Sequence, residues 1–161
     1  KANGKLVIIN SDKNTFKTDL EDLKSKINKN TKAIIINYPN NPTGVLLNEK
    51  ELKQLCDCLL EKEKEYNQNI YLISDEPYRE LIYHDIKYPF VTNYYDNSIV
   101  CYSFSKSLSL PGERIGYILV SNSCKNNNVS NKQQSNSNIG FEDESHSFEL
   151  DENDDHSFEL R

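Results

Sequence analysis

The fold of this chain is decided by residues 32–78, which read KAIIINYPNNPTGVLLNEKELKQLCDCLLEKEKEYNQNIYLISDEPY. Two short apolar runs, Ala33–Ile36 and Ile70–Ile73, flank a longer and more charged stretch. Both runs are nearly continuous in hydrophobicity and rich in isoleucine, which is typical of strands that are covered on both faces. The stretch between them carries apolar residues at helical spacing. Residues 32–78 therefore predict a strand, a helix and a second strand parallel to the first.

The helix in the middle has a clear beginning and an apolar stripe. Asn48 and Glu51 make a capping-box-like start, and the helix is predicted over about 49–66. Its apolar stripe consists of four leucines, namely Leu52, Leu55, Leu59 and Leu60. A shorter helix is predicted over 19–27, with Thr18 as its N-cap.

Three further apolar runs extend the pattern outward: Leu6–Ile9 before it, and Ile99–Tyr102 and Ile115–Val120 after it. The last run is interrupted by Gly116. The resulting alternation of strands and helices predicts an α/β fold with a mainly parallel β-sheet and flanking helices. In such sheets, ligands bind beyond the carboxyl ends of the strands.

The charge of the chain is unevenly distributed. Of its 161 residues, 19 are Lys or Arg and 25 are Asp or Glu, which gives a net charge of -6. Residues 1–120 hold 16 basic and 16 acidic side chains, so they have no basic excess suited to nucleic acid. No apolar run approaches the ~20 residues that a membrane span needs. We therefore expect neither a nucleic-acid partner nor a membrane-spanning segment.

The composition changes at the end of the last apolar run. Residues 122–161 are rich in Asn, Ser, Asp and Glu, and they repeat HSFEL at 146–150 and 156–160. Such a segment buries too little apolar area to offset its ordering entropy, so we predict a disordered low-complexity insertion. The alternatives are a short interaction tract and a histidine-based metal site. Because the chain starts at Lys1 and ends at Arg161 inside this tract, we expect it to be a piece of a longer protein.

The four cysteines are Cys56, Cys58, Cys101 and Cys124. Cys56 and Cys58 are two positions apart on the predicted helix, so their side chains point to opposite sides and cannot share one metal ion. Cys101 lies in an apolar run and is interpreted as a small core residue. This pattern favours neither a metal site nor a disulfide framework, and it suggests a reducing, cytoplasmic location.

Polar side chains follow two of the predicted strands. Residues 37–44 contain two prolines and a glycine, and this rigid loop presents the amide of Asn41. Residues 74–80 present Asp75 at the strand end and Tyr78 just after it. The plain alternatives, when each segment is considered by itself, are that the first loop is only a turn leading into the helix and that Asp75 is only a helix cap before a proline.

A third polar segment follows the fourth apolar run. Residues 103–114, SFSKSLSLPGER, place Lys106 among hydroxyl residues and Arg114 eight positions later. Hydroxyl groups and Arg114 can bind a phosphate, while Lys106 can form a Schiff base with an aldehyde. Pyridoxal 5'-phosphate carries both groups, whereas the plain alternative for this segment is a polar surface turn.

Three motifs in order, NPTG at 41–44, SDEPY at 74–78 and SFSK…PGERIGY at 103–117, resemble the signatures of class I/II aminotransferases. These are pyridoxal-phosphate enzymes of fold type I, and the resemblance covers residues 6–120. It implies that residues 1–121 are part of the large cofactor-binding domain. It also implies amino acid and 2-oxo acid substrates and a homodimeric complete protein.

The resemblance assigns expected roles to individual residues. Lys106 would hold the cofactor as a Schiff base and move the proton during catalysis. Asp75 would pair with the pyridine nitrogen and keep it protonated, while Tyr78 and Asn41 would bind the ring's phenolate oxygen.

Ser103 and Arg114 would bind the phosphate. The arginine that binds the substrate carboxylate is expected outside this chain, so we expect the chain alone to be inactive.

Other functions remain open from the sequence. A carbon–sulfur lyase or a decarboxylase on the same scaffold would have the same cofactor site. A non-catalytic remnant has no need of Lys106, Asp75 and Arg114 together. A nucleotide-binding domain is disfavoured because the chain has neither of the glycine-rich phosphate-binding motifs of such domains.

Overall fold

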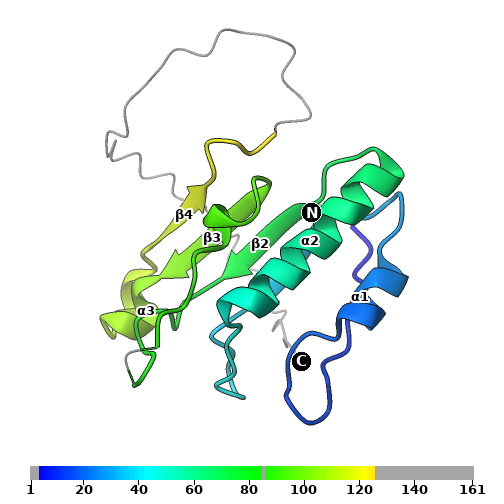
Figure 1. The fold of residues 1–161 in the computed structure, drawn as a ribbon. Helices are drawn as coiled ribbons and strands as arrows, with labels where there is room; N and C mark the ends of the chain where they lie inside the picture. Colours follow the sequence, from blue (N-terminus) through cyan, green and yellow to red (C-terminus); the bar gives the residue numbers. More distant parts are fainter. Residues whose placement is uncertain (1–3, 85, 126–161) are drawn as a thin grey trace, which may run out of the picture. The chain divides into compact units, whose positions relative to one another are not determined.

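The computed structural model describes residues 4–84 and 86–125. In chain order the elements are α1 (Leu20–Lys26), β1 (Ala33–Asn37), α2 (Glu49–Tyr66), β2 (Tyr71–Asp75), the 3-10 helix η1 (Val91–Asn93), β3 (Ser98–Ser103), α3 (Phe104–Ser107), the 3-10 helix η2 (Pro111–Glu113) and β4 (Gly116–Val120) (Figure 1). The strands form one sheet in the order β1-β2-β3-β4. β1, β2 and β3 are parallel, and β4 pairs antiparallel with β3. The predicted α/β fold with a mainly parallel sheet is confirmed.

Helix α2 has the bounds that the sequence predicts, and its start is a complete capping box. The Asn48 side chain accepts from the Glu51 backbone N–H, and the Glu51 carboxylate accepts from the Asn48 backbone N–H. The helix ends at Tyr66, and its C-cap, Asn67, adopts the left-handed conformation that is common directly after helices. Three of the four stripe leucines are buried, but Leu60 is 39% exposed, so the prediction for this residue is wrong. It lies at the edge of the buried stripe, beside Leu59.

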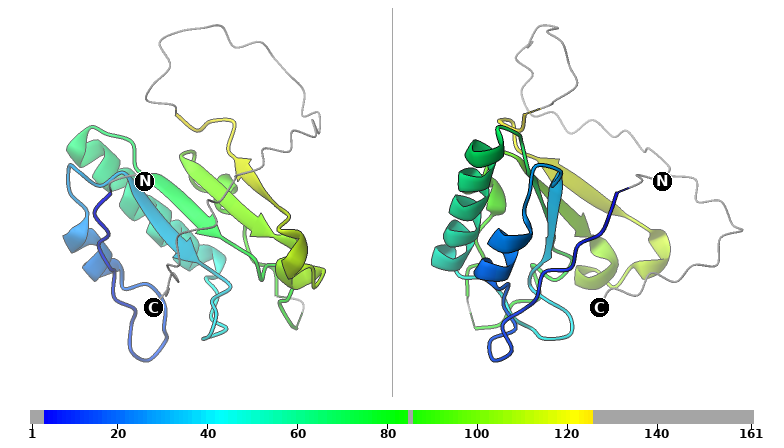
Figure 2. Two further views of the ribbon diagram at one scale, coloured as in Figure 1. Left: turned by 180° about the vertical axis from the view of Figure 1, so that it is seen from behind. Right: turned by 90° about the vertical axis from the view of Figure 1, so that its right-hand side faces the viewer.

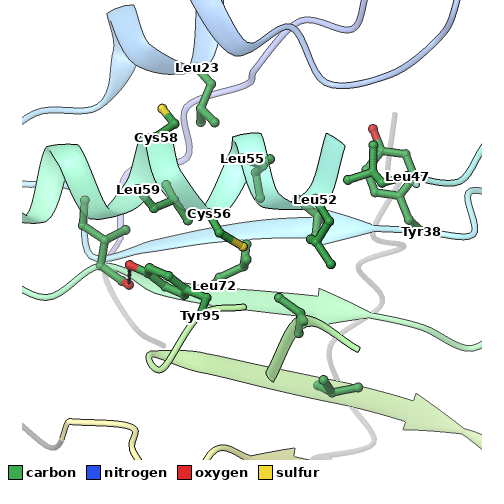
Figure 3. Packing of buried hydrophobic residues seen from close by; sticks show 14 of the residues in the cluster. Leu23, Tyr38, Leu47, Leu52, Leu55, Cys56, Cys58, Leu59, Leu72 and Tyr95 are labelled. Carbon is green, nitrogen blue, oxygen red and sulfur yellow. Dashed lines mark hydrogen bonds between the residues drawn. The ribbon is translucent and has the colours of Figure 1, made fainter. Parts of the chain in front are cut away.

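The hydrophobic core lies between α2 and one face of the sheet (Figure 3). Leu52, Leu55 and Leu59 of the helix and Leu72 of β2 are all at most 1% exposed. Cys56 points toward the sheet and Cys58 toward α1, as predicted from their spacing (Figure 3). Both thiols are buried, and burial raises the pKa of Cys56 to about 12. The two cysteines therefore act as small core residues on opposite sides of the helix.

Helix α1 begins one residue later than the sequence predicts. Its N-cap is Asp19, whose side chain accepts from the backbone N–H groups of Glu21 and Asp22. The Thr18 hydroxyl is instead hydrogen-bonded to the Tyr38 hydroxyl at 3.0 Å, and the Thr18 backbone N–H donates to the same oxygen. Thr18 thus ties the start of α1 to the end of β1, and the predicted cap at Thr18 is wrong.

The predicted strand at Leu6–Ile9 is absent: these residues form no strand. Polar side chains of α1 form hydrogen bonds with the backbone of this segment, whereas in a sheet a neighbouring strand would form them. The Lys26 ammonium donates to the Ile8 carbonyl at 2.8 Å, and Asp22 accepts from the Asn10 backbone N–H at 2.7 Å. Leu6 and Ile8 are largely exposed, so this apolar run is not buried in the way that the strands of the sheet are.

Both longer helices lie on the same side of the sheet (Figure 2). Side chains along β2 and β3 alternate between buried and half-buried, with Leu72 and Val100 facing α2. The other face carries Ile35 and Ile118, which are 68% and 66% exposed in the described part of the chain. The expectation of cover on both faces is therefore wrong for these residues. Cys101 belongs to this open face and is only half-buried, which corrects its interpretation as a core residue.

Within the described ranges, no helix is both long and apolar enough to cross a membrane. Of the predicted low-complexity insertion at 122–161, residues 126–161 lie outside the described part of the chain.

Candidate functional site

The candidate site lies at the carboxyl ends of the three parallel strands (Figure 1). β1 ends at Asn37, β2 at Asp75 and β3 at Ser103. Because parallel strands end at the same edge of the sheet, the polar segments that follow them meet there. This edge brings together residues that are more than sixty positions apart in the sequence.

Tyr78 is the meeting point of three of these segments. The Asn41 side-chain amide donates a hydrogen bond to the Tyr78 hydroxyl at 2.9 Å. The Lys106 ammonium lies 5.7 Å from the centroid of the Tyr78 ring, within the range of a cation–π contact. The loop after β1, the segment after β2 and the short helix α3 after β3 therefore converge on one phenol.

Asp75 ends β2 on the open face of the sheet and is half-buried. Burial raises the pKa of this carboxyl above its ordinary value, and a hydrogen bond from Asn37 opposes that rise. The Asn37 amide lies directly across the strand pair and donates to Asp75 Oδ2 at 3.0 Å. We did not single out Asn37 from the sequence. The sequence held part of the signal, because Asn37 directly follows the apolar run of β1, but its pairing with Asp75 comes from the strand register.

Directly after Asp75, the chain forms a buried ion pair that the sequence analysis also missed. Glu76 is completely buried and accepts from the Ser74 hydroxyl at 2.7 Å and from Arg79 Nε at 2.5 Å. The Arg79 guanidinium also donates to the carbonyls of Tyr88 and Pro89.

Aromatic rings cover the same arginine. Its guanidinium carbon lies 4.6 Å from the centroid of the Tyr88 ring and 3.8 Å from that of the Phe90 ring. Strand alternation explains the arrangement, because Glu76 continues the buried positions Leu72 and Ser74 while Asp75 lies on the open side. The pair therefore fixes the backbone on both sides of Tyr78.

Ser103 ends β3 and caps the short helix α3, which carries Lys106. Its Oγ accepts from the Ser105 backbone N–H at 3.2 Å and bonds the Ser105 hydroxyl at 2.8 Å. The Tyr102 hydroxyl donates to the Ser107 hydroxyl at 2.6 Å, which holds the other side of the helix. Hydroxyl groups thus fix the turn that presents the lysine.

Arg114 lies next to this turn because β4 pairs with β3. Gly116 is opposite Ser103, and a Cβ at Gly116 would lie 2.3 Å from the Tyr102 carbonyl oxygen, so only glycine fits there. Arg114 adopts a left-handed conformation, and its guanidinium donates to the Pro111 carbonyl at 3.3 Å. No hydrogen bond joins Arg114 to Ser103 within residues 4–84 and 86–125.

The site is an open edge in the described part of the chain. Asn41, Lys106 and Arg114 are exposed, whereas Asp75, Tyr78 and Ser103 are half-buried. The described residues alone therefore do not exclude water from the lysine amine.

Comparison with known proteins identifies the protein family of this chain. Residues 1–143 match the family model of aminotransferase class I and II. The chain belongs to this family. An aspartate aminotransferase of Pyrococcus horikoshii is 42% identical to it over 109 residues, which are 67% of this chain and 26% of the Pyrococcus protein. The resemblance that the three motifs indicate is thereby confirmed.

Solved structures agree with this membership. An amino transferase of Eubacterium rectale has a TM-score of 0.70 and 53% identity, covering 71% of this chain and 29% of that protein. A PLP-dependent aminotransferase of Streptococcus suis has a TM-score of 0.56 and 36% identity, covering 69% of this chain and 28% of that protein. The aminotransferase-family chain thus spans between a quarter and a third of the length of these relatives, and the family depends on pyridoxal phosphate.

Proposed function

We propose that the complete protein is an aminotransferase that moves an amino group from an amino acid to a 2-oxo acid, with pyridoxal 5'-phosphate at the sheet edge. The proposal depends most on one observation: the Asn41 amide and the Lys106 amine, from two separate segments, both lie against Tyr78. This cluster lies at the same edge as Asp75. A packing role alone does not explain why a lysine, an amide, a phenol and a carboxylate gather at one edge.

The residues present fit the chemical groups of the cofactor. Asp75 Oδ2 is held by Asn37, and Oδ1 has no hydrogen-bond partner among the described residues, so Oδ1 is available to a pyridine nitrogen. The Tyr78 hydroxyl accepts from Asn41, which leaves its own proton to donate to a phenolate oxygen. Tyr78 and Asn41 would therefore bind the phenolate oxygen of the ring together.

The phosphate would lie beside α3. The Ser103 hydroxyl is at the start of this helix, and the Arg114 guanidinium offers a fork of donors that matches phosphate oxygens. In the described part of the chain Arg114 has one hydrogen bond, to the Pro111 carbonyl, so its remaining donors are available.

When bound, the cofactor supplies an electron sink for the bond broken at the substrate's α-carbon. Lys106 would be its covalent attachment point and, once displaced by the substrate amine, would carry the proton to and from the α-carbon. An ionised Asp75 would hold a proton on the pyridine nitrogen, because opposite charges in contact stabilise each other. Family resemblance also supports a homodimer for the complete protein.

The test uses the full-length protein, purified with and without pyridoxal phosphate. We expect a visible absorbance band from the covalently bound cofactor, and we expect Lys106→Ala to abolish it. A band that survives in Lys106→Ala would show that Lys106 is not the attachment point. Lys87→Ala is the matched control, since Lys87 lies outside the site and should leave the band unchanged.

Single-turnover reactions with individual amino acids then identify the reaction. The relatives are named for aspartate, N-acetyl-LL-diaminopimelate and aromatic amino acids, so the panel should include aspartate, an N-acetylated diamino acid and aromatic donors. Transamination converts the bound cofactor to its amine form and releases a 2-oxo acid without ammonia. Release of ammonia together with a 2-oxo acid would instead indicate a lyase on the same scaffold.

A further inference from the structure

The side chain of Asn37 is bonded to Asp75 through both hydrogens of one amide nitrogen. Its Nδ2 donates to Asp75 Oδ2 at 3.0 Å and to the Asp75 backbone carbonyl at 3.1 Å. The two residues are partners in the β1–β2 register, so the amide reaches the carboxylate directly across the strand pair. Both donors of this nitrogen are used on one residue.

The orientation of the Asn37 amide is itself fixed by the loop that carries Asn41. Asn40 Nδ2 donates to Asn37 Oδ1 at 3.3 Å and to the Asn37 backbone carbonyl at the same distance. Asn40 Oδ1 in turn accepts from the Thr43 hydroxyl at 2.7 Å. Because each amide oxygen accepts from a donor, the nitrogen of Asn37 is the atom that faces Asp75.

We propose that Asn37 is a positioning residue for Asp75, which holds one carboxylate oxygen so that the other faces the ring nitrogen of the cofactor. This inference rests on the proposed function. It assigns Asn37 a role that acts through Asp75.

Two physical effects make this hydrogen bond consequential. Half-burial favours the neutral form of the Asp75 carboxyl, which cannot attract a proton to the ring. A donor on Oδ2 favours the ionised form and also prevents rotation of the carboxylate. Asn37 therefore favours the ionised form of Asp75 and also fixes the orientation of its carboxylate.

The experiment uses the full-length protein loaded with pyridoxal phosphate that is ¹⁵N-labelled at the ring nitrogen. The ring-nitrogen chemical shift reports its protonation, and cofactor affinity is measured separately by titration of the cofactor-free protein. Asn37→Asp places a second carboxylate against Asp75 without changing side-chain size, and Asn37→Leu removes the donor. Asn93→Asp is the control, because Asn93 is exposed and lies outside the site.

We expect both Asn37 variants to move the ring-nitrogen signal toward the unprotonated value and to weaken cofactor binding by about tenfold to a hundredfold, since a hydrogen bond to a charged group is lost. Asn93→Asp should behave as the wild type. Wild-type signals in a folded Asn37→Asp protein would overturn the inference. Asp75→Ala separates the two claims: if it shifts the signal and Asn37→Asp does not, only the role of Asn37 fails. If Asp75→Ala also leaves the signal unchanged, the proposed site fails as well.

Discussion

Replacing Arg79 with methionine should destabilise the segment that carries Tyr78. The change keeps most of the aliphatic stem but leaves the completely buried Glu76 carboxylate without its cationic partner. Removing one partner of a buried ion pair costs about 3–5 kcal/mol, because the remaining charge is desolvated and unpaired. The carbonyls of Tyr88 and Pro89 lose their donors at the same time, so we expect the upper part of that range.

The measurement is urea unfolding of the full-length protein, combined with hydrogen exchange. We expect a lower urea midpoint for Arg79→Met and faster exchange at the amides of Arg79 and Leu81. These amides bond the carbonyls of Glu76 and Tyr78 within the same segment. Local opening is therefore detectable even where another part of the complete protein unfolds independently.

Lys24→Met is the matched control. It removes the same charge from an ion pair with Glu61, but these side chains are 41% and 66% exposed. Exposed pairs contribute only about 0–1 kcal/mol. If Arg79→Met costs no more than Lys24→Met, the argument from burial is wrong. The double variant Glu76→Gln/Arg79→Met should cost less than the sum of its single changes, because it leaves no unpaired charge.

Two further predictions concern other parts of the sheet edge. Gly116→Ala should destabilise the protein by about 1–3 kcal/mol, because the new Cβ would lie 2.3 Å from a backbone carbonyl of β3; a thermal midpoint equal to that of the wild type would contradict this. In the cofactor-free protein, burial raises the pKa of Asp75 above its unfolded value, so the folded state binds more protons and stability falls as pH rises through that window. Asp75→Asn should therefore gain in thermal midpoint relative to the wild type from about pH 4 to about pH 7, and an equal difference at both pH values would refute the argument.

Local chemistry made several elements predictable from the sequence. The capping box at Asn48 and the leucine spacing fixed α2, since both act within a few residues along the chain. The apolar runs fixed β1, β2 and β3 for the same reason. The motif residues were singled out because they lie at or just after the ends of strands, which is where α/β sheets bind ligands.

Errors arose where a competing partner lay elsewhere in the chain. Thr18 has the chemistry of an N-cap, but Tyr38 occupies its hydroxyl. The run at Leu6–Ile9 has the composition of a strand, but α1 bonds its backbone through Lys26. Neither Tyr38 nor Lys26 can be recognised as a partner from the residues that neighbour Thr18 or Ile8 in the sequence.

The order of α1, β1, α2, β2, β3 and β4 and the identity of the polar residues at the strand ends were determined by the sequence alone, because hydrophobic periodicity and capping are local properties. Only the tertiary structure decided which of those residues touch. The contact of Asn37 with Asp75 depends on the register of two strands, and the Glu76–Arg79 pair is packed by Tyr88 and Phe90, which come from a later segment. Both follow from packing between segments distant in the chain, which no local pattern encodes.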